Sequence, residues 1–161
     1  MADHSLLIIL GNQLFPIEEI KRTKIKKVFM KEDLGLCTNY RHHKLKIFFF
    51  LSSMRQYRDY LLENGYEVIY HSIDDQSFDV DFLKVLDQEI KENSISDLGY
   101  FEIEDDEFND KFKSFLKEKK IKTNEFQSPM FLCSKTEFKD FFGNKSLRMV
   151  SFYQMMRKKY D

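Results

Sequence analysis

Residues 5–14 read SLLIILGNQL, and this stretch decides the fold. After Ser5 the run to Leu10 is short and wholly apolar, a pattern typical of a β-strand buried on both faces of a parallel sheet. The run stops at GNQLFP, residues 11–16, which is rich in turn-forming residues. We therefore expect residues 5–10 to form a central strand of a parallel sheet.

Four further segments repeat this short apolar pattern, and each predicts a strand. Between them, apolar residues three and four positions apart predict helices over residues 42–64, 79–92 and 106–118. Strands that alternate with helices favour right-handed crossovers and a covered sheet. The predicted fold is an α/β, Rossmann-like three-layer sandwich with a mostly parallel five-stranded sheet. The further strands are expected at residues 26–31, 66–71, 95–102 and 121–126.

The segment after Ser128-Pro129 departs from this alternation. It carries two helical stretches on either side of Phe142-Gly143-Asn144 and ends in a basic, methionine-rich helix. We therefore expect a Rossmann-like domain over residues 1–128, followed by a C-terminal helical extension over residues 129–161.

The bulk composition argues against several classes of protein. A net charge of −1 provides no overall field that would draw the molecule onto nucleic acid or an anionic membrane. The longest apolar run, residues 47–51, is far shorter than a membrane span, and the acidic N-terminal start does not resemble a signal peptide. We therefore expect a cytoplasmic protein. Cys37 and Cys133 stand apart from any CxxC or Cys/His cluster, which argues against a disulfide framework, a zinc site or an iron–sulfur cluster.

The loop after the first strand is the first candidate site, because ligands of open α/β sheets bind beyond the carboxyl ends of the strands. It comprises Gly11, Asn12, Gln13 and Leu14. Glycine allows close approach of the backbone, and the two amides suit the edge of a heterocycle. An ordinary strand-ending turn would explain the same residues. Neither a dinucleotide fingerprint nor a P-loop is present.

The adjacent histidines His42 and His43 form the second candidate site, at the expected start of the long helix. Successive helix positions lie about 100° apart, so His43 leads the apolar stripe while His42 leads the face that carries Lys46. Extra positive charge at a helix N-terminus is unfavourable unless an anion is near, which favours a ligand; hydrogen-bonded structural histidines are the alternative. We expect no metal site, because no HExxH or second histidine at i+4 accompanies the pair. No activated nucleophile, and hence no catalytic residue, can be named.

Three blocks of sequence together resemble the deoxyribodipyrimidine photolyase-related proteins, the prokaryotic photolyase and cryptochrome branch that carries an iron–sulfur cluster. LIILGNQL, residues 7–14, resembles the family's opening LxLGDQL. HHKLKIFFFLSSMRQY, residues 42–57, resembles HHKxKIxFxxSAMRxF. FLCSKTEF followed by KSLRMVSFYQMMRKK, within residues 131–159, resembles FLSSxxEF and KSLxMExFYRxMRRK. The order and spacing also agree, so the resemblance covers nearly the whole chain.

The resemblance implies an N-terminal antenna domain that binds an accessory chromophore, 6,7-dimethyl-8-ribityllumazine. In such proteins the absorbed light passes to FAD in a separate helical domain that repairs ultraviolet-damaged DNA. FAD and the iron–sulfur cluster are then expected only in that FAD-binding catalytic domain, a partner in cis or in trans, and DNA only through it. By motif, the resemblance assigns the chromophore contacts to Gly11, Asn12 (usually Asp in the family), Gln13, Leu14, Glu32, His42 and His43, and Tyr40, one position from the family's Tyr, is included with them.

Two departures from the family pattern bear on the chromophore. An ungapped count from Glu32 puts Leu36 and Asn39 where the family usually has Glu and Tyr, with Tyr40 one position away. The family's EPGEWR loop is here EIEDDE, residues 102–107. If those positions bind the lumazine, we expect its affinity to be reduced or lost.

Two alternative functions follow from the same sequence. One is an interaction or scaffold domain of the same family with a degenerate chromophore site. The other is a small nucleotide-binding enzyme, against which the missing glycine fingerprint and nucleophile weigh. In the antenna hypothesis, the histidines and lysines orient a polar ligand edge, and the phenylalanines of residues 48–50 anchor the helix to the sheet.

Overall fold

The structure, a computed structural model, describes residues 4–38, 40–143, 146 and 148–160 of the 161-residue chain. The chain divides into two compact units, Met1–Gln127 and Ser128–Asp161, each described through these residues. In the described part of the chain, no helix is long and apolar enough to cross a membrane.

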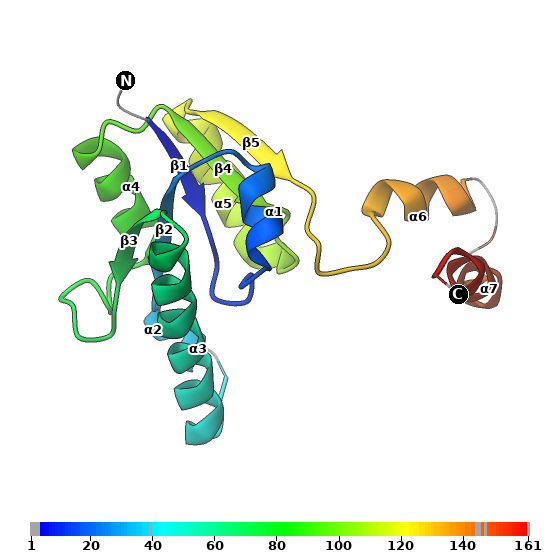
Figure 1. Cartoon of the computed structure of the whole chain (residues 1–161), viewed down its shortest axis with the longest axis horizontal. Helices are drawn as coiled ribbons and strands as arrows, with labels where there is room; N and C mark the ends of the chain where they lie inside the picture. The colour runs from blue at the N-terminus through cyan, green and yellow to red at the C-terminus, as the bar shows by residue number, and fades with distance from the viewer. Residues whose placement is uncertain (1–3, 39, 144–145, 147, 161) are drawn as a thin grey trace. The chain divides into compact units, whose positions relative to one another are not determined.

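The first unit is built on a five-stranded sheet in the order β3-β2-β1-β4-β5, with every pairing parallel (Figure 1). The predicted α/β fold is therefore confirmed, and all five expected strands are present. The order of the strands places β1 in the centre of the sheet, where residues 6–9 are fully buried. The strands are β1 (Ser5–Ile8), β2 (Lys27–Lys31), β3 (Glu67–His71), β4 (Asp97–Phe101) and β5 (Lys122–Phe126).

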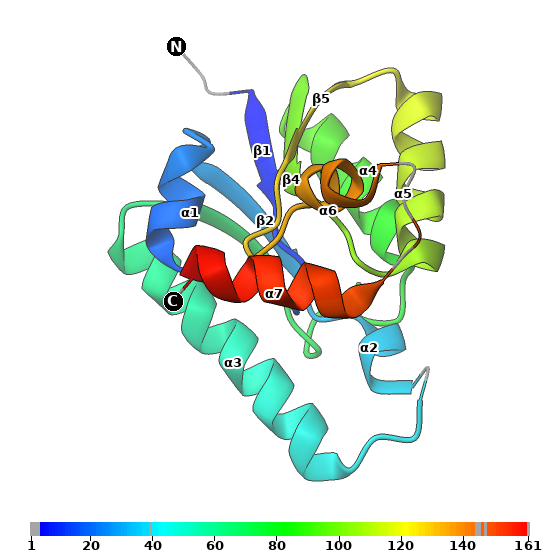
Figure 2. The same ribbon diagram turned by 90° about the vertical axis from the view of Figure 1, so that its right-hand side faces the viewer.

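Helices cover both faces of the sheet (Figure 2). The helices α1 (Ile17–Arg22) and α3 (Lys44–Glu63) pack on one face, and α4 (Phe82–Glu92) and α5 (Asp106–Lys119) pack on the other. Alternate residues of β1 point into the two layers, since Leu7 belongs to the core under α3 and Leu6 to the core under α5. This arrangement explains why the strand is apolar without interruption.

The predicted helices agree with α3, α4 and α5 to within a few residues, and each begins at a side-chain cap. His43 accepts a hydrogen bond from the Leu45 N–H at 3.2 Å, and Asp81 and Asp105 cap α4 and α5 in the same way. The sequence analysis missed α1 and α2 (Leu34–Thr38). These helices have six and five residues, too few for a helical period to stand out.

The expectation that the phenylalanines of residues 48–50 anchor α3 is wrong for two of the three. Phe50 packs against the core, whereas Phe48 is 71% exposed and Phe49 is 73% exposed. Three consecutive helix positions span about 200°, so they cannot all face the sheet. The buried residues of α3 begin only at Leu51, and its first turns extend past the strand ends (Figure 1).

The second unit contains α6 (Lys135–Phe142) and α7 (Met149–Tyr160), in agreement with the two helical stretches expected after residue 129. Ser134 caps α6 by accepting from the Glu137 N–H at 3.0 Å, and Gly143, at a φ of +48°, ends it. Aromatic rings join the two helices, with Phe152 5.0 Å from Phe138 and 5.8 Å from Phe142 between ring centroids. This unit therefore has a small aromatic core of its own.

Candidate functional site

A cavity of about 360 Å³ lies in the first unit, next to the residues that follow β1, β2 and β4. The chain runs outward from β1 to β2 and β3, and then returns to place β4 on the other side of β1. The carboxyl ends of β1 and β4 are therefore the switch point of the sheet, where ligands of open α/β folds bind. The volume lies within the range of about 300–1,000 Å³ that is typical of small-molecule sites.

Apolar and polar residues both line this cavity, and most of the surface that faces it is apolar. Three aromatic rings contribute, from Phe50 on α3, Phe82 at the start of α4 and Phe108 on α5. Such a wall suits a planar, aromatic ligand, with the polar residues left to fix its orientation. The other apolar residues of the lining are Leu10, Leu36, Ile47 and Ile103, and the polar ones are Asn12, Lys31, Asp33, Cys37, His42, Lys46 and Asp105.

Gly11 and Asn12, from the loop after β1, both line the cavity. A Cβ atom on Gly11 would lie 2.7 Å from Phe50 Cζ and 2.8 Å from Met54 Sδ, distances that real Cβ contacts do not reach. Any larger residue at this position would have to displace the Phe50 ring and the Met54 side chain, because α3 packs directly against the loop. Asn12 is exposed, and its amide is available to a ligand.

Gln13 and Leu14, from the same loop, do not line the cavity. The buried Gln13 side chain donates from Nε2 to the backbone oxygen of Glu102 at 2.9 Å, which joins the loop after β1 to the loop after β4. Leu14 packs against the core beneath α3. Both residues stabilise the loops at the switch point through contacts within the protein, and a direct contact with a ligand stays a prediction.

Glu32, directly after β2, is fully buried and also lies outside the cavity lining. Arg55 binds it with two hydrogen bonds, Nε to Oε1 at 2.6 Å and Nη2 to Oε2 at 2.9 Å. The Tyr70 hydroxyl donates to Oε1 at 2.6 Å, and the Ile73 N–H donates to Oε2 at 2.8 Å. Burial opposes ionisation, but these hydrogen bonds outweigh it and hold the pKa of Glu32 below its ordinary value. Glu32 therefore fastens α3 to β2 and β3.

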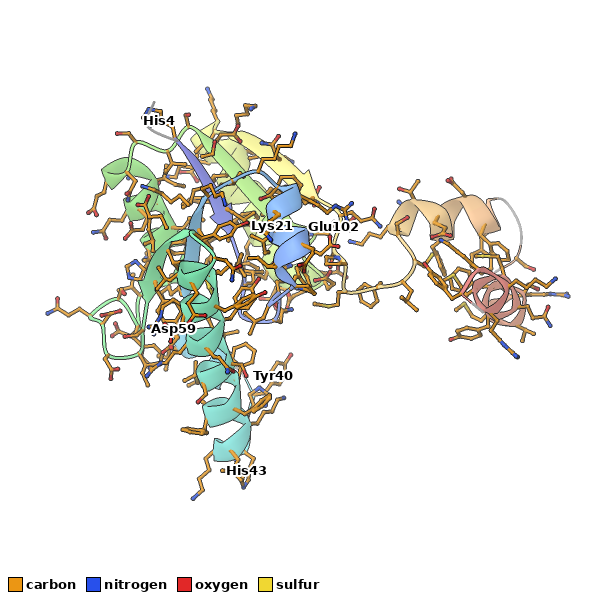
Figure 3. The ribbon with its side chains drawn as sticks, in the orientation of Figure 1. His4, Lys21, Tyr40, His43, Asp59 and Glu102 are labelled. Carbon is orange, nitrogen blue, oxygen red and sulfur yellow. The ribbon has the colours of Figure 1, made fainter. Side chains whose placement is uncertain are left out.

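The two histidines have different surroundings. His42 lines the cavity, and its Nδ1 lies 3.3 Å from Lys46 Nζ. His43 is the exposed N-cap of α3 and is not part of the lining. Tyr40 is 74% exposed, also outside the lining, with its ring centroid 5.9 Å from that of His42. Figure 3 shows Tyr40 and His43 at the N-terminal end of α3. Of these three candidates, the structure brings only His42 to the cavity.

Several residues of the cavity were not singled out from the sequence. Lys31 and Asp33 flank Glu32 and form an ion pair at 2.7 Å, in which the Lys31 side chain is fully buried. Applying the strand-end rule to β2 as well as β1 would have found both. Cys37 also lines the cavity; burial raises the pKa of its thiol, and the negative charges of Glu32 and Asp33 add to the effect.

Some of the residues that depart from the family pattern line the cavity. Leu36 lines it, and Asn39 lies outside the described residues. Ile103 and Asp105 of the EIEDDE loop line it as well. The Asp105 carboxylate accepts from the Phe108 N–H at 2.8 Å and so caps α5.

A separate network of hydrogen-bonded side chains lies outside the cavity. Ser77 Oγ is 2.8 Å from His71 Nδ1, and His71 Nε2 is 2.9 Å from Glu89 Oε1. Glu89 also accepts from the Asn93 side chain at 3.0 Å. This network connects β3 and the segment after it to α4, and none of its side chains lines the cavity. Among the residues that the structure describes, no three His, Cys, Asp or Glu side chains gather as metal ligands would.

Comparison with known proteins gives two matches. The family described as "Deoxyribodipyrimidine photo-lyase-related protein" matches residues 7–161. A "(6-4) photolyase" of Agrobacterium fabrum (strain C58 / ATCC 33970) is 30% identical over 159 residues, which is 96% of this chain and 31% of the relative. The chain thus spans about a third of the length of the curated relative that it matches.

Proposed function

Because the chain belongs to the deoxyribodipyrimidine photolyase-related protein family, we propose that its first unit binds an accessory chromophore, 6,7-dimethyl-8-ribityllumazine. The observation that carries this proposal is the cavity of about 360 Å³ at the switch point of the sheet, with its wall of three phenylalanines. Position, size and apolar character all match what a small aromatic ligand requires.

The residues at the cavity suit a lumazine. Phe50, Phe82 and Phe108 offer ring surfaces to the heterocycle, and Asn12 and His42 offer hydrogen-bonding groups to its carbonyls, ring nitrogens or ribityl hydroxyls. When bound, the lumazine supplies the absorption of light. The chain's own residues bind it, orient it and exclude water from its ring.

We further propose that this unit acts as an antenna for a catalytic partner. The relative from Agrobacterium fabrum is named a (6-4) photolyase, and this chain corresponds to 31% of its length. In this proposal an FAD-binding catalytic domain, in cis or in trans, holds the FAD and the iron–sulfur cluster and contacts the DNA. The unit described here contributes light harvesting and no bond chemistry.

Titration of the lumazine with the purified chain, followed by its fluorescence, tests the proposal. The two cysteines provide a matched pair of variants, because Cys37 lines the cavity and Cys133 does not. We expect saturable binding to the wild type, no binding to Cys37→Trp, whose indole fills the cavity, and unchanged binding to Cys133→Trp. Binding that survives in Cys37→Trp would place the lumazine elsewhere, and absence of binding to the folded wild type would refute the proposal.

A second candidate function is a partner-binding domain, and the exposed apolar residues of α3 favour it. Leu45, Phe48 and Phe49 are 64%, 71% and 73% exposed and stand three and four positions apart on one face of the helix, and exposed apolar residues that cluster in this way are typical of interaction surfaces. The remaining two thirds of the Agrobacterium relative serves as the probe in a pull-down by this chain. Under this hypothesis the double variant Phe48→Ser/Phe49→Ser loses the interaction, while Tyr153→Ser, an exposed aromatic of α7, keeps it.

A further inference from the structure

The short helix α2 forms part of the cavity wall without being packed into the core. We infer that α2 is a lid that closes over the bound heterocycle, and that Leu36 is the residue through which the lid contacts the ring. The inference rests on the proposed function, because it takes the lumazine as the ligand of the same cavity. It depends on how α2 is held and on what α2 presents to the cavity.

Within the described residues, four helices line the cavity, and α2 differs from the other three in its burial. The helices α3, α4 and α5 each contribute a phenylalanine to the lining, and each also holds several side chains that are buried in the core. By contrast, α2 has no buried residue, and its Cys37 packs against the core while only partly buried. Of these four helices, α2 is therefore the one least held by packing.

The hydrogen bonds that connect α2 to the rest of the unit lie at its N-terminal end. The Leu34 N–H donates to the backbone oxygen of Phe78 at 3.4 Å, and the Gly35 N–H donates to Asp33 Oδ1 at 2.8 Å. At the other end, Thr38 Oγ1 donates to the backbone oxygen of Leu34 at 2.9 Å, a bond within the helix. A helix of five residues is too short to be stable without tertiary contacts. We therefore expect α2 to move about its first residues at a low cost in free energy.

Leu36 lines the cavity, yet its side chain is 41% exposed. Removing an apolar side chain from water is favourable, and a heterocycle bound in the cavity provides the apolar surface that can cover it. This gain opposes the entropy lost when α2 becomes ordered, so the ligand and the closed lid stabilise each other. Leu36, a departure from the family pattern that was expected to weaken binding, thereby becomes a contact that strengthens it.

Two leucines of α2 provide a matched pair of variants. Leu36 lines the cavity, whereas Leu34, which is 36% exposed, does not. We expect Leu36→Ser to raise the Kd of the lumazine, measured by fluorescence titration, about 10-fold, the loss that corresponds to burial of a leucine side chain. Stopped-flow measurements should show most of this loss as faster dissociation. Leu34→Ser should keep the Kd within about twofold of the wild type.

Hydrogen exchange followed by mass spectrometry tests the movement of α2 itself. Without ligand, the amides of residues 34–38 should exchange at least about 10-fold faster than those of residues 51–61, the part of α3 that holds its buried side chains. Saturating lumazine should slow exchange in residues 34–38 of the wild type about 10-fold or more. In Leu36→Ser the same saturation should slow it less, because the lid has lost its contact with the ring.

The outcomes separate the two proposals. Unchanged lumazine affinity in Leu36→Ser, or equal losses in both leucine variants, overturns the role given to Leu36, while binding that Cys37→Trp abolishes still supports the chromophore site. Exchange in residues 34–38 that is as slow as in residues 51–61 before the lumazine is added overturns the lid, because α2 is then a fixed wall. Absence of lumazine binding to the folded wild type overturns both the proposed function and this inference.

Discussion

At the scale of single residues, Gly11 sets how closely α3 approaches the loop after β1. A methyl group at this position would overlap the Phe50 ring and the Met54 sulfur, at 2.7 and 2.8 Å. We predict that Gly11→Ala lowers the free energy of unfolding by about 1–3 kcal/mol, the usual cost of overpacking. Urea denaturation measures this. The neighbouring Asn12→Ala, at an exposed position, should change stability by less than about 0.5 kcal/mol, and an equal loss in both variants would contradict the account.

The lowered pKa of Glu32 makes the free energy of unfolding depend on pH. Its pKa is lower in the folded protein than in the unfolded chain, so the ionised carboxylate stabilises the fold above the unfolded-state value and this contribution is lost as the pH falls through the folded-state pKa. Glu32→Gln breaks the pair with Arg55 and should cost about 2–3 kcal/mol at pH 7, less than the roughly 3–5 kcal/mol of a fully buried pair because Arg55 is 38% exposed.

Denaturation curves of both proteins between pH 7 and pH 3 check this prediction. The difference in stability between wild type and Glu32→Gln should narrow below about pH 4.5, where wild-type Glu32 becomes protonated in the unfolded chain. A difference that stays constant over this range would show that the charge of Glu32 is not what stabilises the fold.

Residue by residue, the sequence predicted part of the candidate site. Gly11, Asn12 and His42 could be found because strand ends and helix starts have recognisable residue types, and the structure brings all three to the cavity. Gln13 and Glu32 were also predicted as ligand contacts; in the structure both side chains hydrogen-bond within the protein, and their contact with a ligand stays a prediction. A polar residue near a strand end has the same sequence signature whether its partner is a ligand or a neighbouring loop.

At the scale of elements, α3 shows that apolar periodicity predicts a helix without predicting where the helix lies on the sheet. The spacing of apolar residues predicted the helix, but it did not reveal that the first turns extend beyond the sheet. We predict that Phe48→Ser and Phe49→Ser change the free energy of unfolding by less than about 0.5 kcal/mol, as exposed positions do. Phe50→Ala, which removes a ring packed against the core, should cost about 2–3 kcal/mol. A large loss in Phe48→Ser would show that this end of α3 is packed.

The strands were predictable because a parallel sheet covered on both faces leaves an uninterrupted apolar run in each central strand. The residues that α4 and α5 contribute to the cavity lining could not be predicted from the sequence. Phe82 and Phe108 fit a helix face directed at the core, and only the arrangement of the helices around the strand ends decides which aromatic residues border a cavity. The short helices α1 and α2 were missed because five or six residues contain too little of a helical period.

At the scale of the whole molecule, the cavity and both core clusters lie within the first unit. We predict that a chain ending at Gln127 still unfolds cooperatively and binds the lumazine within about twofold of the full chain, because it keeps every described contact of the cavity. Circular dichroism melting and the lumazine titration measure the two properties. Loss of binding in a truncated chain that is still folded would show that residues 128–161 contribute to the site.

The most direct test of the central claim, that a lumazine occupies the cavity at the switch point, is the alkylation of the two free thiols. Both cysteines are partly buried, and only Cys37 lines the cavity. With iodoacetamide and mass spectrometry on the full chain, saturating 6,7-dimethyl-8-ribityllumazine should slow the modification of Cys37 about tenfold or more and leave Cys133 unchanged. Equal rates at Cys37 with and without bound lumazine would contradict the account.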